Sequence, residues 1–279
     1  MHIYMRYPGG LSKALTFSYD DGVKQDKRLV ELLDKHKMKG TFNLNSGMFA
    51  PEETVFPKSQ IRSRRLTKSV CKELYKNHEI AMHGETHPYL DSIPSCECIK
   101  DIYDDRVNLE VLTDRFVRGL AYPYGTFSEK VDDILKACGV VYARTVVSTE
   151  SFTLPENWLR LNPTCHHNNP KLFDLSKEFL DADNGMYRPC MLFYLWGHTF
   201  EFDDDNNWNV IEDFVELMSK CKEIWYATNI EIYDYIQKYN QLIFNAKCDM
   251  CYNPTDTELF FVANDKACSV KPGEVLNFN

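Results

Sequence analysis

The chain has 279 residues, of which 44% are hydrophobic and 26% charged, and its formal net charge at pH 7 is -9. This length accommodates one large α/β domain or two smaller ones, and the composition is that of an ordinary globular protein. The acidic balance argues against a nucleic-acid-binding protein, because phosphate contacts need clustered lysine and arginine. The short basic cluster of Arg62, Arg64 and Arg65 is better explained as a solvated loop.

The sequence shows no signal peptide, because no apolar stretch of that kind follows the N-terminus, and no run is long enough to cross a bilayer. We therefore expect a cytoplasmic protein without a membrane partner, and export by another route stays open. Ten cysteines in such a chain are best explained as reduced thiols. Cys248 and Cys251 form a C-x-x-C pair, but only Cys268 follows it, which disfavours a zinc ribbon.

Strand-like and helix-like segments alternate along most of the chain. A strand from Ala14 leads into two carboxylates, helix 26–37 follows with leucines at helical spacing, and strand 41–44 comes next. A long loop over 45–66 separates these from the later elements, which we expect as helix 67–77, strand 79–82, helix 96–116, strand 120–122, helix 128–138, strand 140–147, strand 158–161, helix 172–180, strand 191–196, helix 210–219, strand 224–227 and helix 229–239. The alternation is typical of a (β/α) barrel or a related parallel α/β fold.

The pattern changes from Gln241 onward, where short strands are separated by turn signals such as Asn253-Pro254 and Lys271-Pro272-Gly273. We therefore expect a main domain over residues 1–240. Residues 241–279 are predicted to form a small β appendage packed on it.

Asp20 and Asp21 close the first strand and are followed by Gly22. Successive strand side chains point to opposite faces, so both carboxylates can face one site only where the strand ends. Adjacent carboxylates repel each other unless a cation or a proton intervenes, which suggests a metal ligand beside a general base. A solvated Asp-Asp-Gly turn explains these residues equally well.

His83 and His87 follow the strand expected at 79–82, at a spacing that lets both imidazoles reach one metal ion. Gly84 and Pro88 make a regular helix improbable, so we expect a loop here. Such a histidine pair is often structural. In a parallel barrel, however, the carboxyl ends of all strands meet on one face, which would bring the histidines to the aspartate pair and favours a metal site.

Two further motifs complete a family pattern. The chain resembles the polysaccharide deacetylases with the NodB homology domain, carbohydrate esterase family 4, over about residues 11–239. In the order of that family, the matching motifs are Thr16-Phe17-Ser18-Tyr19-Asp20-Asp21-Gly22, His83 with His87, Pro123-Tyr124-Gly125, and Leu195-Trp196-Gly197-His198. The resemblance implies a distorted (β/α) barrel of the NodB type.

The resemblance also implies a role for each motif residue. Asp20 would be the catalytic base and His198 the general acid, and the Tyr124 backbone N–H, next to Pro123, would stabilise the oxyanion. Trp196 would form a wall against the acetyl methyl or a sugar face. A divalent metal, usually zinc with cobalt or nickel as alternatives, would be held by Asp21, His83 and His87.

The implied activity is that of a metal-dependent hydrolase that removes acetyl groups from the nitrogen, or the oxygen, of sugar units in a poly- or oligosaccharide. The alternatives are an O-acetyl polysaccharide esterase and a non-catalytic carbohydrate-binding protein that keeps the metal. The expected partner is therefore an acetylated saccharide, with no nucleic acid and no membrane. The sugar, the metal and the oligomeric state do not follow from the sequence.

The chain departs from the family pattern where an arginine commonly orients the base, since Ala121 stands at that position. Arg160, near the end of another expected strand, is our candidate for the missing group, with an exposed structural arginine as the alternative. Glu201 and Asp203 to Asp205 follow His198 closely. They either line the cleft or form a solvated acidic loop.

Overall fold

The computed structural model describes residues 2–52, 54, 65–183, 185 and 188–278. Its centre is a curled sheet whose strands are β2 (Lys13–Asp20), β3 (Thr41–Leu44), β4 (Glu79–Met82), β5 (Gly119–Ala121), β6 (Tyr142–Arg144), β7 (Cys165–His166), β8 (Met191–Gly197) and β9 (Ile224–Tyr226). The strand order is β6-β5-β4-β3-β2-β8-β7, with β9 paired to β2, and the neighbours are parallel. The sequence alternation thus gives a parallel sheet, as predicted.

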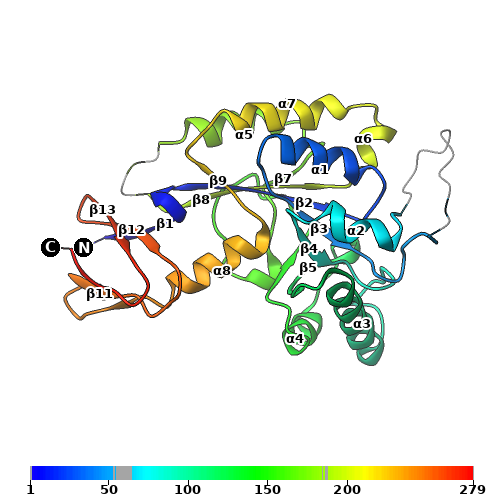
Figure 1. Ribbon diagram of the computed structural model, residues 1–279, viewed down its shortest axis with the longest axis horizontal. Coiled ribbons are helices and arrows are strands. Elements are labelled where there is room, and N and C mark those ends of the chain that lie inside the picture. The colour runs from blue at the N-terminus through cyan, green and yellow to red at the C-terminus, as the bar shows by residue number, and fades with distance from the viewer. Residues whose placement is uncertain (1, 53, 55–64, 184, 186–187, 279) are drawn as a thin grey trace.

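Helices cover both faces of this sheet. They are α1 (Asp26–Lys35), α2 (Lys68–Leu74), α3 (Ser95–Thr113), α4 (Glu129–Ala137), α5 (Leu172–Asp181), α6 (Glu201–Asp204), α7 (Trp208–Ser219) and α8 (Asn229–Tyr239). Figure 1 shows α1, α5 and α7 on one side, and α3 and α4 on the opposite side. The helices are amphipathic: α1 buries Leu29, Val30 and Leu33 and keeps charged residues between them outside.

β2 is the central strand, and all of its residues are buried. One edge pairs with β8 over Lys13 to Tyr19, while the other edge is shared by β9 at the start and β3 at the end. A strand enclosed on both faces needs a near-continuous apolar sequence, which Ala14 to Phe17 largely supplies. The polar residues at its carboxyl end are therefore held in a fixed position inside the molecule.

The sheet curls toward closure through the segment between β6 and β7. Leu161 forms a parallel bridge with Arg144 at the end of β6, and β7 then pairs with β8. Residues at the end of β6 are thereby brought across the interior toward the end of β2. This closure, rather than any local sequence signal, sets the neighbours of the central carboxylates.

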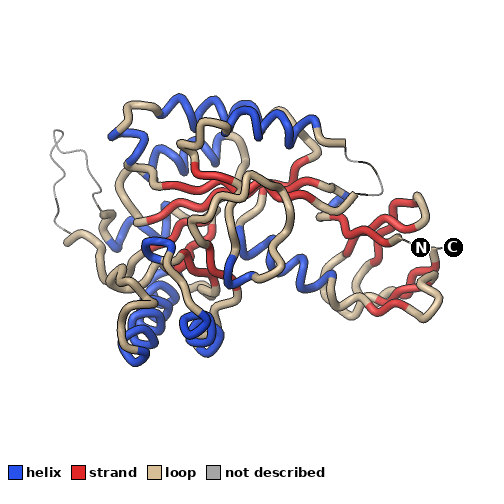
Figure 2. The backbone as a smooth tube through the Cα atoms, turned by 180° about the vertical axis from the view of Figure 1, so that it is seen from behind, coloured by secondary structure: helices blue, strands red, loops and turns tan. Residues whose placement is uncertain are grey.

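A group of antiparallel strands lies at one end of the molecule (Figures 1 and 2). Its strands are β1 (Ile3–Arg6), β10 (Ile243–Phe244), β11 (Met250–Tyr252), β12 (Leu259–Ala263), β13 (Lys266–Val270) and β14 (Val275–Asn277). They form two sheets, β1-β12-β13 and β10-β11-β14. The N-terminal strand β1, which the sequence did not predict, thus joins the C-terminal strands, and the division at residue 240 stays a prediction.

One expected strand needs correction. The strand expected over 158–161 is wrong, because Trp158–Arg160 forms a short 3₁₀ helix and only Leu161 bridges to a strand. The short elements β7 and α6 were not predicted, since two to four residues carry too little periodicity.

The ten cysteines are free thiols. The described part of the chain contains no helix long and apolar enough to cross a membrane.

Candidate active site

The end of β2 turns sharply so that two consecutive carboxylates face one cavity. Asp20 is the last strand residue and is 2% exposed. Asp21 then adopts a φ of 85° and Gly22 a φ of 60°, both in the left-handed region. A non-glycine residue with such a φ is uncommon and tends to occur at functional sites. The strand therefore ends where the sequence predicted.

The cavity beside these carboxylates has a volume of about 530 Å³. Its lining comes from the carboxyl ends of β2, β4, β5, β6 and β8 and the loops after them: Asp20, Asp21, His83, His87, Tyr122, Tyr124, Gly125, Val146, Trp196 and His198. The structure thus brings together the predicted residues, with the exception of Pro123, which is buried beside Tyr124, and Arg160. A cavity of this size accommodates a small-molecule substrate.

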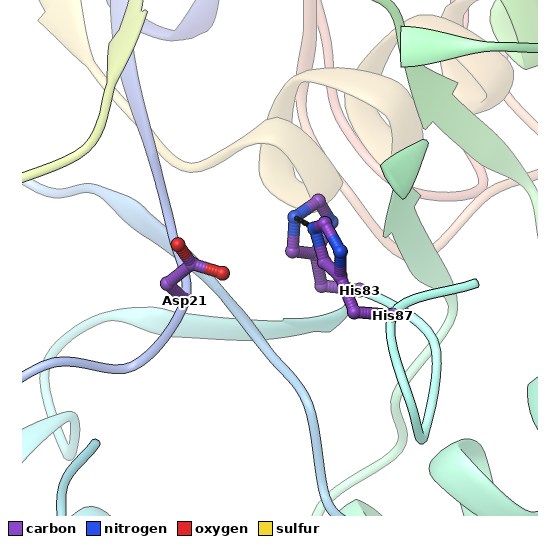
Figure 3. Close-up of side chains that lie close together, drawn as sticks. All are labelled: Asp21, His83 and His87. Atoms are coloured by element: carbon purple, nitrogen blue, oxygen red, sulfur yellow. Dashed lines mark hydrogen bonds between the residues drawn. The ribbon is translucent and has the colours of Figure 1, made fainter. Parts of the chain in front are cut away.

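Asp21, His83 and His87 converge on one point (Figure 3). Each offers one ligand atom, and these atoms lie within 4.8 Å of one another. The two histidine Nε2 atoms are 3.1 Å apart. Tetrahedral ligands at 2.0–2.1 Å from a zinc ion lie about 3.3 Å from each other, so the spacing suits such an ion.

The protonation of His83 also suits a metal ligand. Its Nδ1 lies 2.8 Å from the Ala121 carbonyl oxygen. A carbonyl oxygen can only accept a hydrogen bond, so Nδ1 carries the proton and Nε2 presents a lone pair to the cavity. Burial lowers the pKa of His83 to about 4, which keeps the ring neutral. Arg65 Nη2 lies 2.9 Å from Asp21 Oδ1 and holds that carboxylate. Arg62 and Arg64 lie outside the described residues.

A second group of His166, His167 and Glu201 has similar spacing but different protonation. The Asn168 backbone N–H donates to His166 Nδ1 at 3.1 Å, so the proton of a neutral His166 is on Nε2. That Nε2 lies 3.1 Å from Glu201 Oε2 and donates to it rather than to a metal. We interpret this second group as a hydrogen-bonded cluster around Glu201.

Asp20 is held by two donors. Arg144 Nη2 donates to Oδ2, and Asn43 Nδ2 donates to Oδ1 at 2.8 Å. Arg144 is fully buried, and its guanidinium lies 4.4 Å from the centre of the Trp196 ring. Burial alone would raise the pKa of Asp20, but Arg144, His83 and His198 together outweigh burial and lower the pKa to about 2. The carboxylate is therefore ionised and fixed in place.

The expectation that Arg160 orients Asp20 is wrong. Arg160 Nε donates to Asp132 Oδ2 at 3.0 Å, and Arg160 is not among the residues that line the cavity. Arg144, which the sequence reasoning missed, takes the expected role. The available signal was its place in the strand that follows the Pro-Tyr-Gly motif, since a cation at the end of a neighbouring strand can reach the same face.

His198 lies between Asp20 and Glu201. Its Nε2 is 3.8 Å from Asp20 Oδ2 and its Nδ1 is 3.4 Å from Glu201 Oε1. Burial disfavours the imidazolium, but the bond to Glu201 and the charges of both carboxylates outweigh burial and raise the pKa of His198 above its ordinary value. Glu201 therefore belongs to the site. Asp203 instead accepts bonds from Gln25 and Trp208.

The fold and this cavity define a curled (β/α) barrel with a candidate metal centre at the carboxyl ends of its strands. The chain matches the family described as polysaccharide deacetylase over residues 6–143. The matched range contains both aspartates, both histidines and the Pro-Tyr-Gly motif, whereas His198 lies beyond it.

Solved structures with low sequence identity share the fold. A Mycobacterium smegmatis protein assigned to the polysaccharide deacetylases is 14% identical, with a TM-score of 0.59 over 85% of this chain and 94% of that one. The Xyl-CE4 domain of a multidomain xylanase from the hindgut metagenome of Trinervitermes trinervoides is 12% identical, with a TM-score of 0.53 over 81% and 92%. A family 4 carbohydrate esterase from Streptomyces lividans, in complex with acetate, is 11% identical, with a TM-score of 0.50 over 78% and 93%.

These similarities confirm the predicted NodB-type barrel. None of the curated proteins compared with the chain matches it.

Proposed function

We propose that the protein is a metal-dependent deacetylase that hydrolyses the acetyl group of an N-acetylated sugar unit in a poly- or oligosaccharide. The proposal is carried by one observation: two titratable groups of opposite protonation lie 3.8 Å apart beside a candidate metal centre. Asp20, which is paired with Arg144, has a pKa of about 2 and is ionised, while the pKa of His198 is raised. Environments that move the pKa values of two neighbouring groups apart in this way are typical of a catalytic base and a catalytic acid.

Asp20 takes the role of the general base. It is buried and oriented by Arg144 and Asn43, so its free lone pairs are directed at the cavity, where they can accept a proton from the attacking water. His198 takes the role of the general acid, and its Nε2 on the cavity side donates a proton to the departing amine. We assign the Tyr124 N–H to the oxyanion and the Trp196 ring to the wall beside the acetyl methyl.

Asp21, His83 and His87 would hold the metal, and zinc suits their nitrogen and oxygen donors, with cobalt or nickel as alternatives. When bound, the ion supplies a Lewis acid that polarises the acetyl carbonyl. The neutral state of His83 favours this arrangement, because a protonated ring cannot be a ligand.

The test is acetate release from a panel of N-acetylated and O-acetylated saccharides by purified protein. We expect release from N-acetylated substrates, its loss after treatment with a chelator and its return with zinc. Asp20→Asn should lower the rate about 100-fold to 10,000-fold, the usual contribution of a general base. Release from O-acetyl groups alone would indicate an esterase, and saccharide binding without acetate release would indicate a binding protein. Full activity of both Asp20→Asn and His198→Ala would contradict the assigned roles.

Glu201→Gln is expected to move the alkaline limb of the pH profile of kcat/KM to lower pH by about one unit. The general acid works only while His198 is protonated, so activity falls as pH rises through its raised pKa. Removal of the Glu201 charge makes the protonated form of His198 less stable and so lowers the pKa of His198. Asp205→Asn, an exposed carboxylate nearby, is the matched control and should leave the limb in place. An unchanged limb in Glu201→Gln would contradict the contact between Glu201 and His198.

A further inference from the structure

Two exposed tyrosines form a stacked pair at the rim of the cavity. Tyr89 and Tyr124 are 49% and 52% exposed, their ring centres are 3.8 Å apart, and their planes differ by 10°. Tyr124 itself lines the cavity, and the centre of its ring is 4.4 Å from that of His87. The pair therefore starts beside a candidate metal ligand and extends outward from the cavity.

The stack is fixed by the loops that carry it. Tyr124 has a φ of 58° and His87, two residues before Tyr89, a φ of 56°, so both loops are tightly turned. Thr126 Oγ1 donates to Asp91 Oδ1 at 2.9 Å, which ties the loop after Tyr124 to the loop after Tyr89. Further back, the Glu85 and Thr86 backbone N–H groups donate to the Asp101 carboxylate. The two rings are thus presented as a preformed surface.

A preformed aromatic surface at the mouth of a cavity is a feature of ligand-binding sites, because exposed apolar area is otherwise unfavourable. Within the part of the chain that the structure describes, neither tyrosine hydroxyl has a hydrogen-bond partner. Because the two rings face each other, the outer face of Tyr89 is the one on which the flat apolar face of a sugar ring can pack, while the tyrosine hydroxyls can bond to the sugar. Tyr124 lines the cavity that would hold the reacting unit, so the next unit of a saccharide can reach the rim beside it.

We propose that the Tyr89–Tyr124 stack is a second sugar-binding subsite, which holds the unit adjacent to the one that loses its acetyl group. This inference rests on the proposed deacetylase function and specifies its substrate as a saccharide of two or more units. Tyr89 then determines specificity for chain length. It does not touch the reacting atoms, because its contact with the cavity is through Tyr124.

The experiment compares an N-acetylated hexosamine with its oligomers of two to six units as substrates. Tyr89→Ala should raise KM for the oligomers about tenfold, the equivalent of one aromatic contact, and leave kcat within about twofold. Kinetics on the single sugar should not change, and Tyr89→Phe should retain low KM because it keeps the ring. Tyr252→Ala, an exposed tyrosine on β11, is the matched control. An unchanged oligomer KM in Tyr89→Ala, or an equal rise for the single sugar, would overturn the subsite.

Binding of the fully deacetylated oligomer, followed by calorimetry, tests the subsite without turnover. The wild-type protein should bind it about tenfold more tightly than Tyr89→Ala does. If the wild type releases no acetate from any substrate, the proposed function fails, and the calorimetry still decides the subsite. Equal affinity of the two proteins for the oligomer, or no binding to either, would overturn the subsite while leaving a measured deacetylase activity intact.

Discussion

Arg144→Met is expected to lower kcat/KM for acetate release about 100-fold to 10,000-fold, as much as the loss of the base itself. Without Arg144, the largest contribution that opposes burial is lost and the pKa of Asp20 rises, so the carboxylate is less ionised and keeps only Asn43 to orient it. Removal of one partner from a buried ion pair also costs about 3–5 kcal/mol of unfolding free energy. Steady-state kinetics and urea denaturation measure the two effects.

Arg160→Met is the matched control for Arg144→Met, because Arg160 was the arginine that the sequence suggested. Its partly exposed pair with Asp132 should contribute at most about 1 kcal/mol, and activity should stay within about twofold. Should Arg144→Met fail to fold, the double variant Asp20→Asn with Arg144→Met removes both charges and is expected to recover stability without activity. Greater loss of activity in Arg160→Met than in Arg144→Met would refute the assignment.

His83→Gln is expected to weaken zinc binding more than about 100-fold, since loss of a partner behind a ligand already costs 10-fold to 100-fold. His83 presents a lone pair at Nε2 because its Nδ1 donates to the Ala121 carbonyl, and glutamine supplies no nitrogen lone pair there. Zinc should therefore raise the midpoint of thermal unfolding of the wild type but not of this variant. Competition with a chromogenic chelator gives the affinities.

His166→Gln is the counterpart, because it removes a histidine from the second three-residue group. The proton on His166 Nε2 is directed at Glu201, so zinc affinity should stay within about twofold. Metal content after gel filtration should be one zinc per chain in the wild type and in His166→Gln. Loss of zinc from His166→Gln with retention in His83→Gln would show that the metal lies in the other group.

The motif residues could be predicted from the sequence because each follows its own strand directly. Asp20 and Asp21 end β2, His83 follows β4, and His198 follows β8, so the parallel order alone places them on one face. The boundaries of α8 and β3 also agree with the periodicity of their residues.

The supporting groups could not be predicted in the same way. Arg144 meets Asp20 only because the sheet curls, and the two residues are 124 positions apart in the chain. The place of Arg144 at the end of a strand allows it to reach the same face, but the local sequence does not identify Asp20 as its partner. Glu201 reaches His198 from a helix of four residues, too short to show a pattern. Contacts set by closure of the barrel depend on the whole fold.

The left-handed backbone at Asp21, His87 and Tyr124 sets the stability of the chain against the side chains that it places at the cavity. Glycine would adopt each of these conformations at lower cost, yet the chain keeps a carboxylate, an imidazole and an aromatic ring there. Conformational free energy on the order of 1 kcal/mol or more is given up at each position. These three positions therefore keep a functional side chain at the cavity at the expense of backbone stability, which is the usual direction of a stability–activity trade-off.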